Sequence, residues 1–170
     1  MREILEAKIG RNLLERGWKL AVAESCTGGL IGHRITNIPG SSEYYLGSIT
    51  AYSYPAKERL LGVRHETLFR YGAVSRQTAL EMARGIRRTM AGDDPWENSV
   101  GVSITGIAGP GGATPEKPIG LVWIGLSMPS LEGAWKFVGV GNRKENKAFS
   151  AQMALKLLYD ALLGYPLPEN

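Results

Sequence analysis

The sequence contains few of the residues from which disulfides and metal sites are built. Among its 170 residues there is one cysteine, Cys26, and there are two histidines, His33 and His65. A single cysteine excludes an intrachain disulfide and a cluster of thiolates, and two histidines argue against a structural zinc site. No apolar run approaches the ~20 residues that cross a bilayer, and the first residues lack the unbroken apolar centre of a signal peptide. We therefore expect a cytoplasmic protein that binds neither metal nor membrane.

The sequence also lacks a strong excess of one charge. It has 20 Lys and Arg against 16 Asp and Glu, a net charge of +4. A nucleic-acid-binding protein usually concentrates basic residues more strongly, so we do not expect nucleic acid as a partner. With 44% hydrophobic and 21% charged residues, the composition is typical of a globular protein. The length predicts a single domain over residues 1–170 with one core.

Periodic patterns predict alternating helices and strands. Apolar residues at helical spacing, with glycine, proline or serine at the ends, predict helices at 2–17, 28–37, 54–62, 75–92 and 143–163. Short apolar runs predict strands at 18–25, 43–53, 99–105, 120–127 and 133–140. This alternation predicts an α/β protein: a three-layer α/β/α sandwich with a mostly parallel sheet of about five strands. The last strands are expected to form a hairpin, and a glycine-rich loop lies at the carboxyl ends.

Three segments should meet at one edge of this sheet. In open α/β sheets, ligands bind where the carboxyl ends of strands meet loops and helix N-termini. Residues 24–29, 52–57 and 105–112 each follow a predicted strand. They define the candidate site.

Ser25 lies between a strand end and a helix N-terminus, which suits a nucleophile. Its hydroxyl can face a carbonyl group, and free N–H groups of the following residues can bind an oxyanion. The alternative is that Ser25 or Thr27 only caps the helix. Cys26 is a better nucleophile by nature, but its neighbouring position predicts a buried thiol that faces elsewhere.

A serine nucleophile needs a base, and lysine is the best-placed candidate. His33 falls within a predicted helix and His65 in a polar loop, so neither is expected at a strand end. Lys57 stands near the start of a helix, five residues after Tyr52, which closes the second strand. A free lysine has a pKa of about 10.4 and is charged at neutral pH, so catalysis requires burial that lowers this pKa. The alternative for Lys57 is an ordinary exposed lysine, and for Tyr52 an ordinary strand aromatic.

The segment "TGIAGPGGATPEKPIG" at 105–120 is rich in glycine and is long for a surface loop. Its backbone could surround an anion. It matches neither the nucleotide-hydrolase phosphate loop, because no Gly-Lys-Ser/Thr ends it, nor the dinucleotide fingerprint.

Several long motifs in one order resemble a known family. "ESCTGGLI", "PGSSEYYLGSITAYS", "AKERLLGV", "YGAVS", "ITGIAGPGGATPEKPIGLVWIG" and "GNRKENKAFSAQMALKLL" resemble the C-terminal domain of CinA, the competence- and damage-inducible proteins. That domain is also found alone as the nicotinamide-nucleotide amidase PncC. The resemblance covers essentially the whole chain.

The resemblance implies hydrolysis of nicotinamide mononucleotide to nicotinate mononucleotide and ammonia, in pyridine nucleotide recycling, by a serine-lysine mechanism without metal or cofactor. It implies that Ser25 is the nucleophile, Lys57 the base, and Tyr52 the hydroxyl that links or orients them. It also implies a homodimer or larger homo-oligomer. For the oxyanion and the substrate phosphate, the expected residues are Thr27, Gly28, Gly29, Thr105, Gly106, Gly109, Gly111, Gly112 and Arg143.

The sequence departs from the family pattern at two positions. Residue 54 is tyrosine where asparagine is common, which could alter substrate fit beside Lys57. Residue 142 is asparagine where aspartate is common, which could change how Arg143 is oriented. The large N-terminal domain of full CinA proteins is absent from this sequence, so no pyrophosphatase activity is expected.

Other functions remain open at this point. One alternative is a regulatory module that binds the nucleotide without turnover, and another is an amidase for a different small amide. DNA binding, which the word competence suggests, rests only on the mild net charge.

Overall fold

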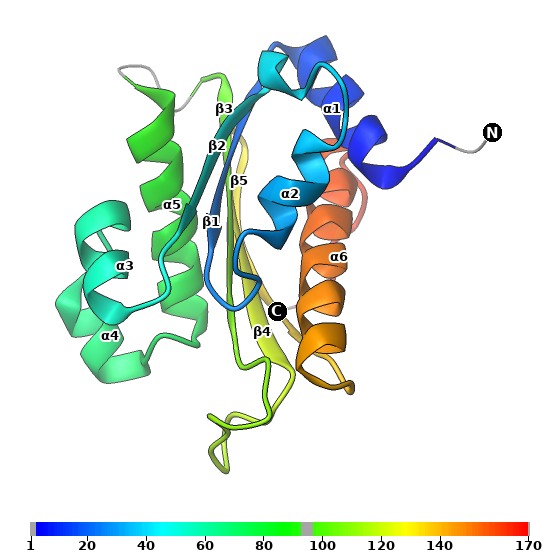
Figure 1. The fold of residues 1–170 in the computed structure, drawn as a ribbon. Coiled ribbons are helices and arrows are strands. Elements are labelled where there is room, and N and C mark those ends of the chain that lie inside the picture. Colours follow the sequence, from blue (N-terminus) through cyan, green and yellow to red (C-terminus); the bar gives the residue numbers. More distant parts are fainter. Residues whose placement is uncertain (1–2, 93–96, 170) are drawn as a thin grey trace.

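A mixed five-stranded sheet lies between two layers of helices in the computed structural model, which describes residues 3–92 and 97–169 (Figure 1). Strands β1 (Lys19–Glu24), β2 (Tyr45–Thr50) and β3 (Ser99–Gly106) are parallel, and β4 (Leu121–Met128) and β5 (Leu131–Val138) form an antiparallel hairpin beside β3. The sheet order is β2-β1-β3-β4-β5. The predicted three-layer α/β/α sandwich, with its hairpin at one side, is confirmed.

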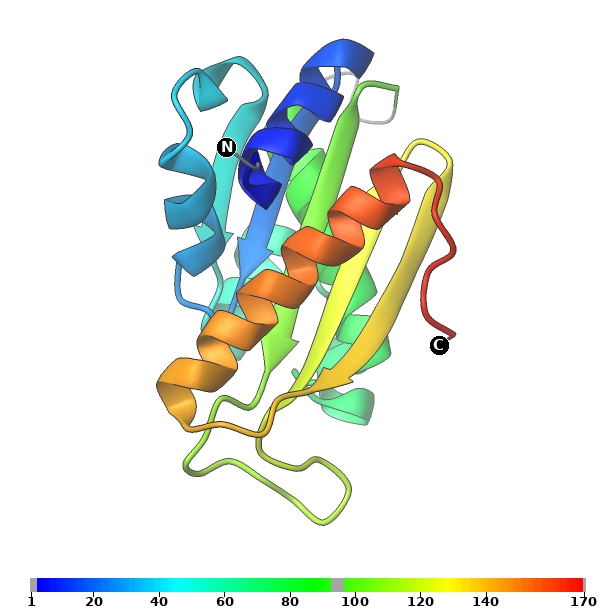
Figure 2. The same cartoon turned by 90° about the vertical axis from the view of Figure 1, so that its right-hand side faces the viewer.

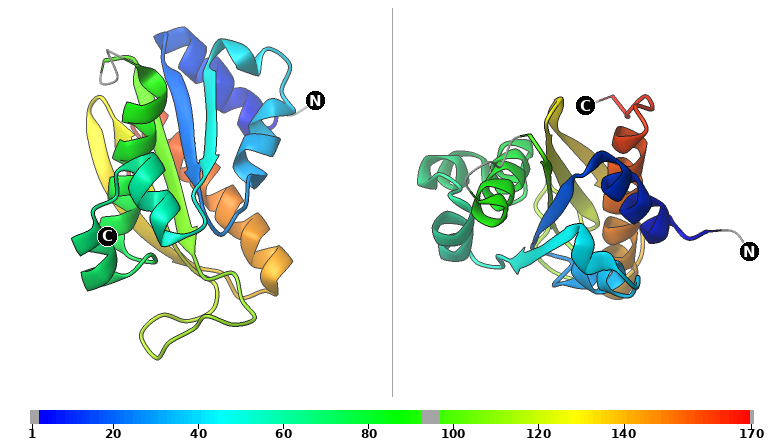
Figure 3. Two further views of the ribbon diagram at one scale, coloured as in Figure 1. Left: turned by 60° about the vertical axis from the view of Figure 1, so that its left-hand side comes forward. Right: turned by 90° about the horizontal axis from the view of Figure 1, so that it is seen from above.

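Three helices cover each face of the sheet. On one face lie α1 (Leu5–Arg16), α2 (Leu30–Thr36) and α6 (Arg143–Leu162), with α6 crossing the strands diagonally (Figure 2). The opposite face carries α3 (Tyr54–Leu61), α4 (His65–Tyr71) and α5 (Arg76–Ala91) (Figure 3). A short 3₁₀ helix, η1 (Ser41–Glu43), precedes β2. Among the described helices, none has both the length and the apolar character needed to cross a membrane.

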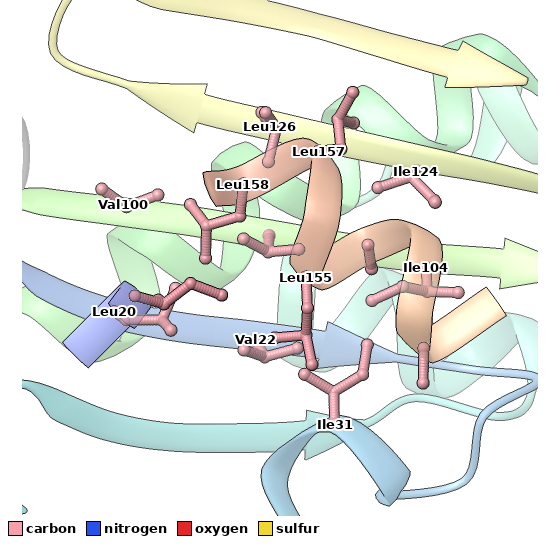
Figure 4. Packing of buried hydrophobic residues seen from close by; sticks show 14 of the residues in the cluster. Leu20, Val22, Ile31, Val100, Ile104, Ile124, Leu126, Leu155, Leu157 and Leu158 are labelled. Carbon is pink, nitrogen blue, oxygen red and sulfur yellow. The ribbon is translucent and has the colours of Figure 1, made fainter. Parts of the chain in front are cut away.

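Strand β1 shows how the side-chain alternation builds two cores. Leu20 and Val22 point into the larger core under α6, together with the residues labelled in Figure 4. Ala21 and Ala23 point to the other face, where they belong to a smaller core. Because successive strand residues face opposite sides, a continuous apolar strand serves both layers.

Small residues let α5 pack closely against this second face. A Cβ atom added to Gly101 of β3 would clash with the Ala83 carbonyl oxygen of α5, and one added to Gly125 of β4 would clash with the Ala79 carbonyl oxygen. Larger residues at these strand positions would push α5 away from the sheet.

The helix ends follow the expected capping residues. Gly17 ends α1 in the left-handed conformation, with φ of 65°. Ser75 caps α5, where its hydroxyl oxygen accepts a hydrogen bond from the Thr78 N–H at 3.2 Å. Pro55 lies in the first turn of α3, where the lack of an N–H costs little. These predicted boundaries are confirmed to within one or two residues.

The prediction of a polar loop around His65 is wrong, because His65 is the first residue of α4. This helix has only seven residues and no side-chain cap, so it is too short to give a clear periodic pattern. Burial of Leu68 fixes it in the core. The second strand is also shorter than predicted, since Glu43 belongs to η1, Tyr44 to the turn after it, and β2 ends at Thr50.

Candidate active site

The carboxyl ends of β1, β2 and β3 meet at one edge of the sheet, as the sequence predicts. The Ala51 N–H donates to the Glu24 carbonyl oxygen at 2.9 Å and so holds the end of β2 against the end of β1. Helix α3 follows β2 directly, and its first turn therefore lies beside the residue that follows β1. That residue is Ser25.

Ser25 and Lys57 are in direct contact. Lys57 Nζ donates a hydrogen bond to Ser25 Oγ at 3.0 Å and another to the Ala51 carbonyl oxygen at 2.7 Å. Both side chains are buried, with 7% of Ser25 and 1% of Lys57 exposed. Ser53 caps α3 by accepting from the Ala56 N–H, which fixes the helical turn that carries the lysine. The alternative of an exposed lysine is wrong.

Burial changes the charge state of this lysine. Removal from water lowers the pKa of Lys57 from 10.5 to about 8, because a buried ammonium loses its hydration. About a tenth of the amine is then neutral at pH 7, far more than for a free lysine. The Ala51 carbonyl accepts one N–H, so the lone pair of the neutral amine is available for the Ser25 hydroxyl proton. The pair has the geometry of a nucleophile and its general base.

Glu24 caps α2, the role that was the alternative for Ser25 or Thr27. Helix α2 has no side-chain cap at its N-cap residue, Gly29. Instead, the fully buried Glu24 carboxylate accepts from the Thr27 hydroxyl at 2.6 Å and from the N–H groups of Gly29, Ile31 and Gly32 at 2.9–3.2 Å. The hypothesis that Ser25 or Thr27 caps α2 is therefore wrong. An acid just before a helix N-terminus was the sequence signal for this role.

These hydrogen bonds narrow the set of oxyanion donors. The Gly28 N–H donates to the Ser25 carbonyl oxygen at 3.1 Å, and the Gly29 N–H donates to Glu24. Within the described part of the chain, the Thr27 N–H has no protein acceptor, whereas the backbone N–H of Cys26 contacts its own thiol. Among residues 27–29, Thr27 is thus the one whose N–H is open to a ligand, and the oxyanion site itself stays a prediction.

Cys26 is a buried thiol. Its exposed fraction is 6%, and burial raises the pKa of the Cys26 thiol to about 12. A thiol with this pKa is protonated at neutral pH and is a poor nucleophile. The expectation of a buried thiol at this position is confirmed.

Tyr52 lies apart from the Ser25–Lys57 contact. Its side chain is 61% exposed, and its hydroxyl accepts a hydrogen bond from the Arg143 guanidinium at 3.0 Å. Lys57 reaches Ser25 directly, so the contact itself does not pass through Tyr52, and the role of Tyr52 as the hydroxyl that links or orients the pair stays a prediction.

Arg143 connects α6 to the glycine-rich loop as well as to Tyr52. Its second guanidinium nitrogen donates to the Gly109 carbonyl oxygen at 2.7 Å, and Figure 2 shows the start of α6 beside this loop. Gly109 has φ of 87° and is followed by a cis proline. Gly111 and Gly112 lie further along the loop and are exposed.

Asn146 of α6 also binds the glycine-rich loop, and the sequence analysis did not identify it as a site residue. Its buried amide donates to the carbonyl oxygens of Ala108 at 3.1 Å and Gly141 at 2.8 Å. Nothing in the linear pattern marks this asparagine, because its partners lie on two separate loops. It fixes where α6 begins relative to the loop.

Thr105 and Gly106 lie at the end of β3. The buried Thr105 hydroxyl donates to the Ala73 carbonyl oxygen at 2.8 Å, which attaches β3 to the segment before α5. Gly106 pairs with Val122 of β4. The Thr105 hydroxyl is thus occupied by a structural contact.

The two departures from the family pattern have structural partners. The Tyr54 hydroxyl accepts from the Ala73 N–H at 3.2 Å and so joins α3 to the segment before α5. Asn142 caps α6 in a capping box with Glu145, a role for which asparagine and aspartate are equally suited. Their effects on substrate fit and on Arg143 stay predictions.

A cleft of about 620 Å³ adjoins the site, between the turn after Ser25 and the first turns of α6. Thr27, Gly28 and Gly29 form one wall, and Arg143, Lys144 and Lys147 form the other. In residues 3–92 and 97–169, no three His, Cys, Asp or Glu side chains are grouped as metal ligands would be.

Curated proteins are similar to this chain in sequence. A CinA-like protein of Salinibacter ruber is 47% identical over 152 residues, which cover 89% of this chain and 35% of that protein. One from Thermosynechococcus vestitus is 46% identical over 167 residues, which cover 96% of this chain and 39% of that protein. The chain thus spans less than two fifths of the length of these curated relatives.

Solved structures agree. A CinA superfamily protein from Klebsiella pneumoniae has a TM-score of 0.86 at 31% identity, with 95% of this chain and 97% of that chain covered. A competence/damage inducible protein from Agrobacterium tumefaciens has a TM-score of 0.80 at 36% identity, with 96% and 99% covered. The family model described as the CinA C-terminal domain matches residues 2–162. This chain therefore belongs to the CinA C-terminal domain family.

Proposed function

We propose that this chain is an amidohydrolase that converts nicotinamide mononucleotide to nicotinate mononucleotide and ammonia. The observation that carries the proposal is the buried contact of Lys57 Nζ with Ser25 Oγ at 3.0 Å, with the pKa of Lys57 lowered to about 8. A desolvated lysine beside a serine at a strand end costs stability, and such costs are concentrated at functional sites. The substrate comes from the family resemblance of the motifs around these residues.

In the acylation step, the neutral Lys57 amine accepts the Ser25 hydroxyl proton as Oγ attacks the carboxamide carbon. The Thr27 N–H is the candidate donor to the oxyanion. The Lys57 ammonium then gives its proton to the departing amide nitrogen, so that ammonia leaves and a Ser25 ester of the nicotinate group remains.

In the deacylation step, Lys57 acts as base a second time. It takes a proton from a water molecule that attacks the ester carbon, and it returns this proton to Ser25 Oγ as the ester breaks. The products are the carboxylic acid and the regenerated Ser25–Lys57 pair. Tyr52 has no proton to transfer in this scheme, and its contact with Arg143 gives it a positioning role at the mouth of the site.

The test is release of ammonia from nicotinamide mononucleotide by the purified protein, with and without a chelator. Ser25→Ala and Lys57→Ala should each lower kcat/KM by about 10³-fold or more, and a chelator should have no effect. Tyr52→Phe should lower it by about 10-fold at most, because Lys57 contacts Ser25 without it. Unchanged turnover in Ser25→Ala would show that Ser25 is not the nucleophile.

A substrate panel decides between the alternatives. Nicotinamide and other small amides should be poorer substrates than the mononucleotide. Tight binding of the mononucleotide without turnover by the folded parent protein would identify a nucleotide-binding module instead. Faster turnover of a different amide would support the serine-lysine mechanism and show that nicotinamide mononucleotide is not the preferred substrate.

A further inference from the structure

An unusual concentration of positive charge borders the cleft beside Ser25. Arg143, Lys144 and Lys147 all project from the first two turns of α6, and His33 of α2 lies across from them. Within the described residues, none of these three cations forms an ion pair with a carboxylate. Arg143 donates only to neutral oxygens, those of Gly109 and Tyr52.

This arrangement is unfavourable for the free helix. Cations at a helix N-terminus face the positive end of the macrodipole, and Arg143 and Lys147 are a like-charged i,i+4 pair. The nearby acid, Glu145, turns its carboxylate back to the Asn142 N–H in the capping box, and among the described residues it forms no ion pair with these cations. The charges would be stabilised by an anion in the cleft.

The position of Lys147 relates this charge to the nucleophile. A Cβ atom placed on Gly28 would lie 3.5 Å from Lys147 Nζ. Gly28 is joined to Ser25 by the hydrogen bond of a tight turn, which keeps their Cα atoms within about 7 Å. The ammonium therefore faces the turn that begins at Ser25, on the wall of the cleft that Thr27, Gly28 and Gly29 form. In nicotinamide mononucleotide, the pyridine ring and the ribose lie between the carboxamide and the phosphate, so the phosphate is bound away from the reacting carbon.

We propose that this cleft binds the phosphate monoester of the substrate, with Lys147 as its main cation and Lys144 and Arg143 beside it. This inference rests on the proposed amidase function for the identity of the substrate. It places the phosphate beside the cations of α6 and not on the loop at Gly109–Gly112. Lysine binds phosphate as a compact point charge.

The first experiment compares two substrates that differ only in the phosphate, nicotinamide mononucleotide and nicotinamide riboside. Lys147→Met should lower kcat/KM for the mononucleotide by roughly 10- to 100-fold, as expected for a lost charge-assisted contact, and leave the riboside unchanged. Lys156→Met, an exposed α6 lysine paired with Asp160, should affect neither substrate. An equal loss for both substrates, or no loss, would overturn the proposal.

The second experiment measures binding of ribose 5-phosphate by NMR, which requires no catalysis. We expect saturable shifts at the amides of Gly28, Gly29 and Lys147, with affinity at least 10-fold weaker in Lys147→Met and unchanged in Lys156→Met. Such binding without amidase turnover would retain the phosphate site and refute the proposed function. Turnover of the mononucleotide with shifts elsewhere would retain the function and refute this site.

Discussion

Lys57 Nζ lies 3.0 Å from Ser25 Oγ, inside the protein and 32 residues away in the chain. The contact depends on two parallel strands that end at the same level, one followed by Ser25 and the other by the helix that carries Lys57. The Ala51 carbonyl oxygen, at 2.7 Å from Nζ, fixes the direction of the amine. The end of β1 and the start of α3 thus bury the Lys57 amine, so that it can be neutral and act as a base. On the surface the same side chain would be a charged ammonium.

The pH dependence of activity should report the Lys57 amine. Burial lowers the pKa of Lys57 to about 8, and the base is active only when neutral. We expect kcat/KM to rise about tenfold per pH unit below 8 and to level off above it. The measurement is ammonia release from pH 6.5 to 9.5, with Cys26→Ala as the control that keeps the same profile. A flat profile over this range would rule out Lys57 as the base.

Stability should show the cost of burying this lysine. The pKa of Lys57 is about 8 in the folded protein and close to its ordinary value of 10.5 in the unfolded chain, so the unfolded state binds more protons between these values. The free energy of unfolding of the parent should therefore rise with pH across this window, by on the order of 3 kcal/mol.

Comparison with Lys57→Met isolates this effect, because the variant has no group to titrate there. From pH 7 to pH 11, the difference in free energy of unfolding between parent and variant should move by about 3 kcal/mol in favour of the parent. Denaturant unfolding measures it, with the exposed Lys136→Met as the matched control. A difference independent of pH would mean that Lys57 is not buried as a perturbed amine.

Glu24→Gln should damage both stability and activity. The carboxylate accepts four hydrogen bonds around the N-terminus of α2, and an amide replaces one acceptor oxygen with a donor. We expect a loss of about 2–4 kcal/mol in the free energy of unfolding, with a fall in kcat/KM because the turn after Ser25 loses its support. Glu15→Gln, at an exposed position, should change neither by a measurable amount. Equal behaviour of the two variants would refute this role.

Cys26 should resist thiol reagents in the folded protein. Its side chain is buried and the pKa of its thiol is raised to about 12, so little thiolate is present at pH 8. Labelling by a chromogenic disulfide should proceed only after denaturation, and Cys26→Ala should keep kcat/KM within about 3-fold of the parent. Rapid labelling of the native protein with loss of activity would reopen Cys26 as the nucleophile.

Most of the fold could be predicted because its signals are local. The alternation of apolar strands and amphipathic helices predicted the layers, and Gly17, Ser75 and Pro55 marked helix ends through their own backbone preferences. Helix α4 was missed because its seven residues hold little pattern. Its helical state is fixed by burial of Leu68 against other elements, which a local pattern does not contain.

The site was predictable as a set of segments, but its hydrogen bonds were not. Glu24 has the capping role that was the alternative for Ser25 or Thr27, because its carboxylate reaches four donors once β1 ends beneath α2. The Tyr52 hydroxyl accepts a hydrogen bond from Arg143, which lies 91 residues away in the chain. Such pairings depend on distances between elements, and these distances are set by packing.

The sequence by itself determined the element types, the sheet edge where Ser25 and Lys57 would meet, and the family to which the chain belongs. Periodicity, turn residues and motif order are properties of the chain read in one dimension. Only the tertiary structure decided that Lys57 is buried and has a lowered pKa, and that the cations of α6 border the cleft beside Gly28. A pKa and a binding cleft arise from the dielectric and the charges that surround a group, and those surroundings exist only after the helices have packed against the sheet.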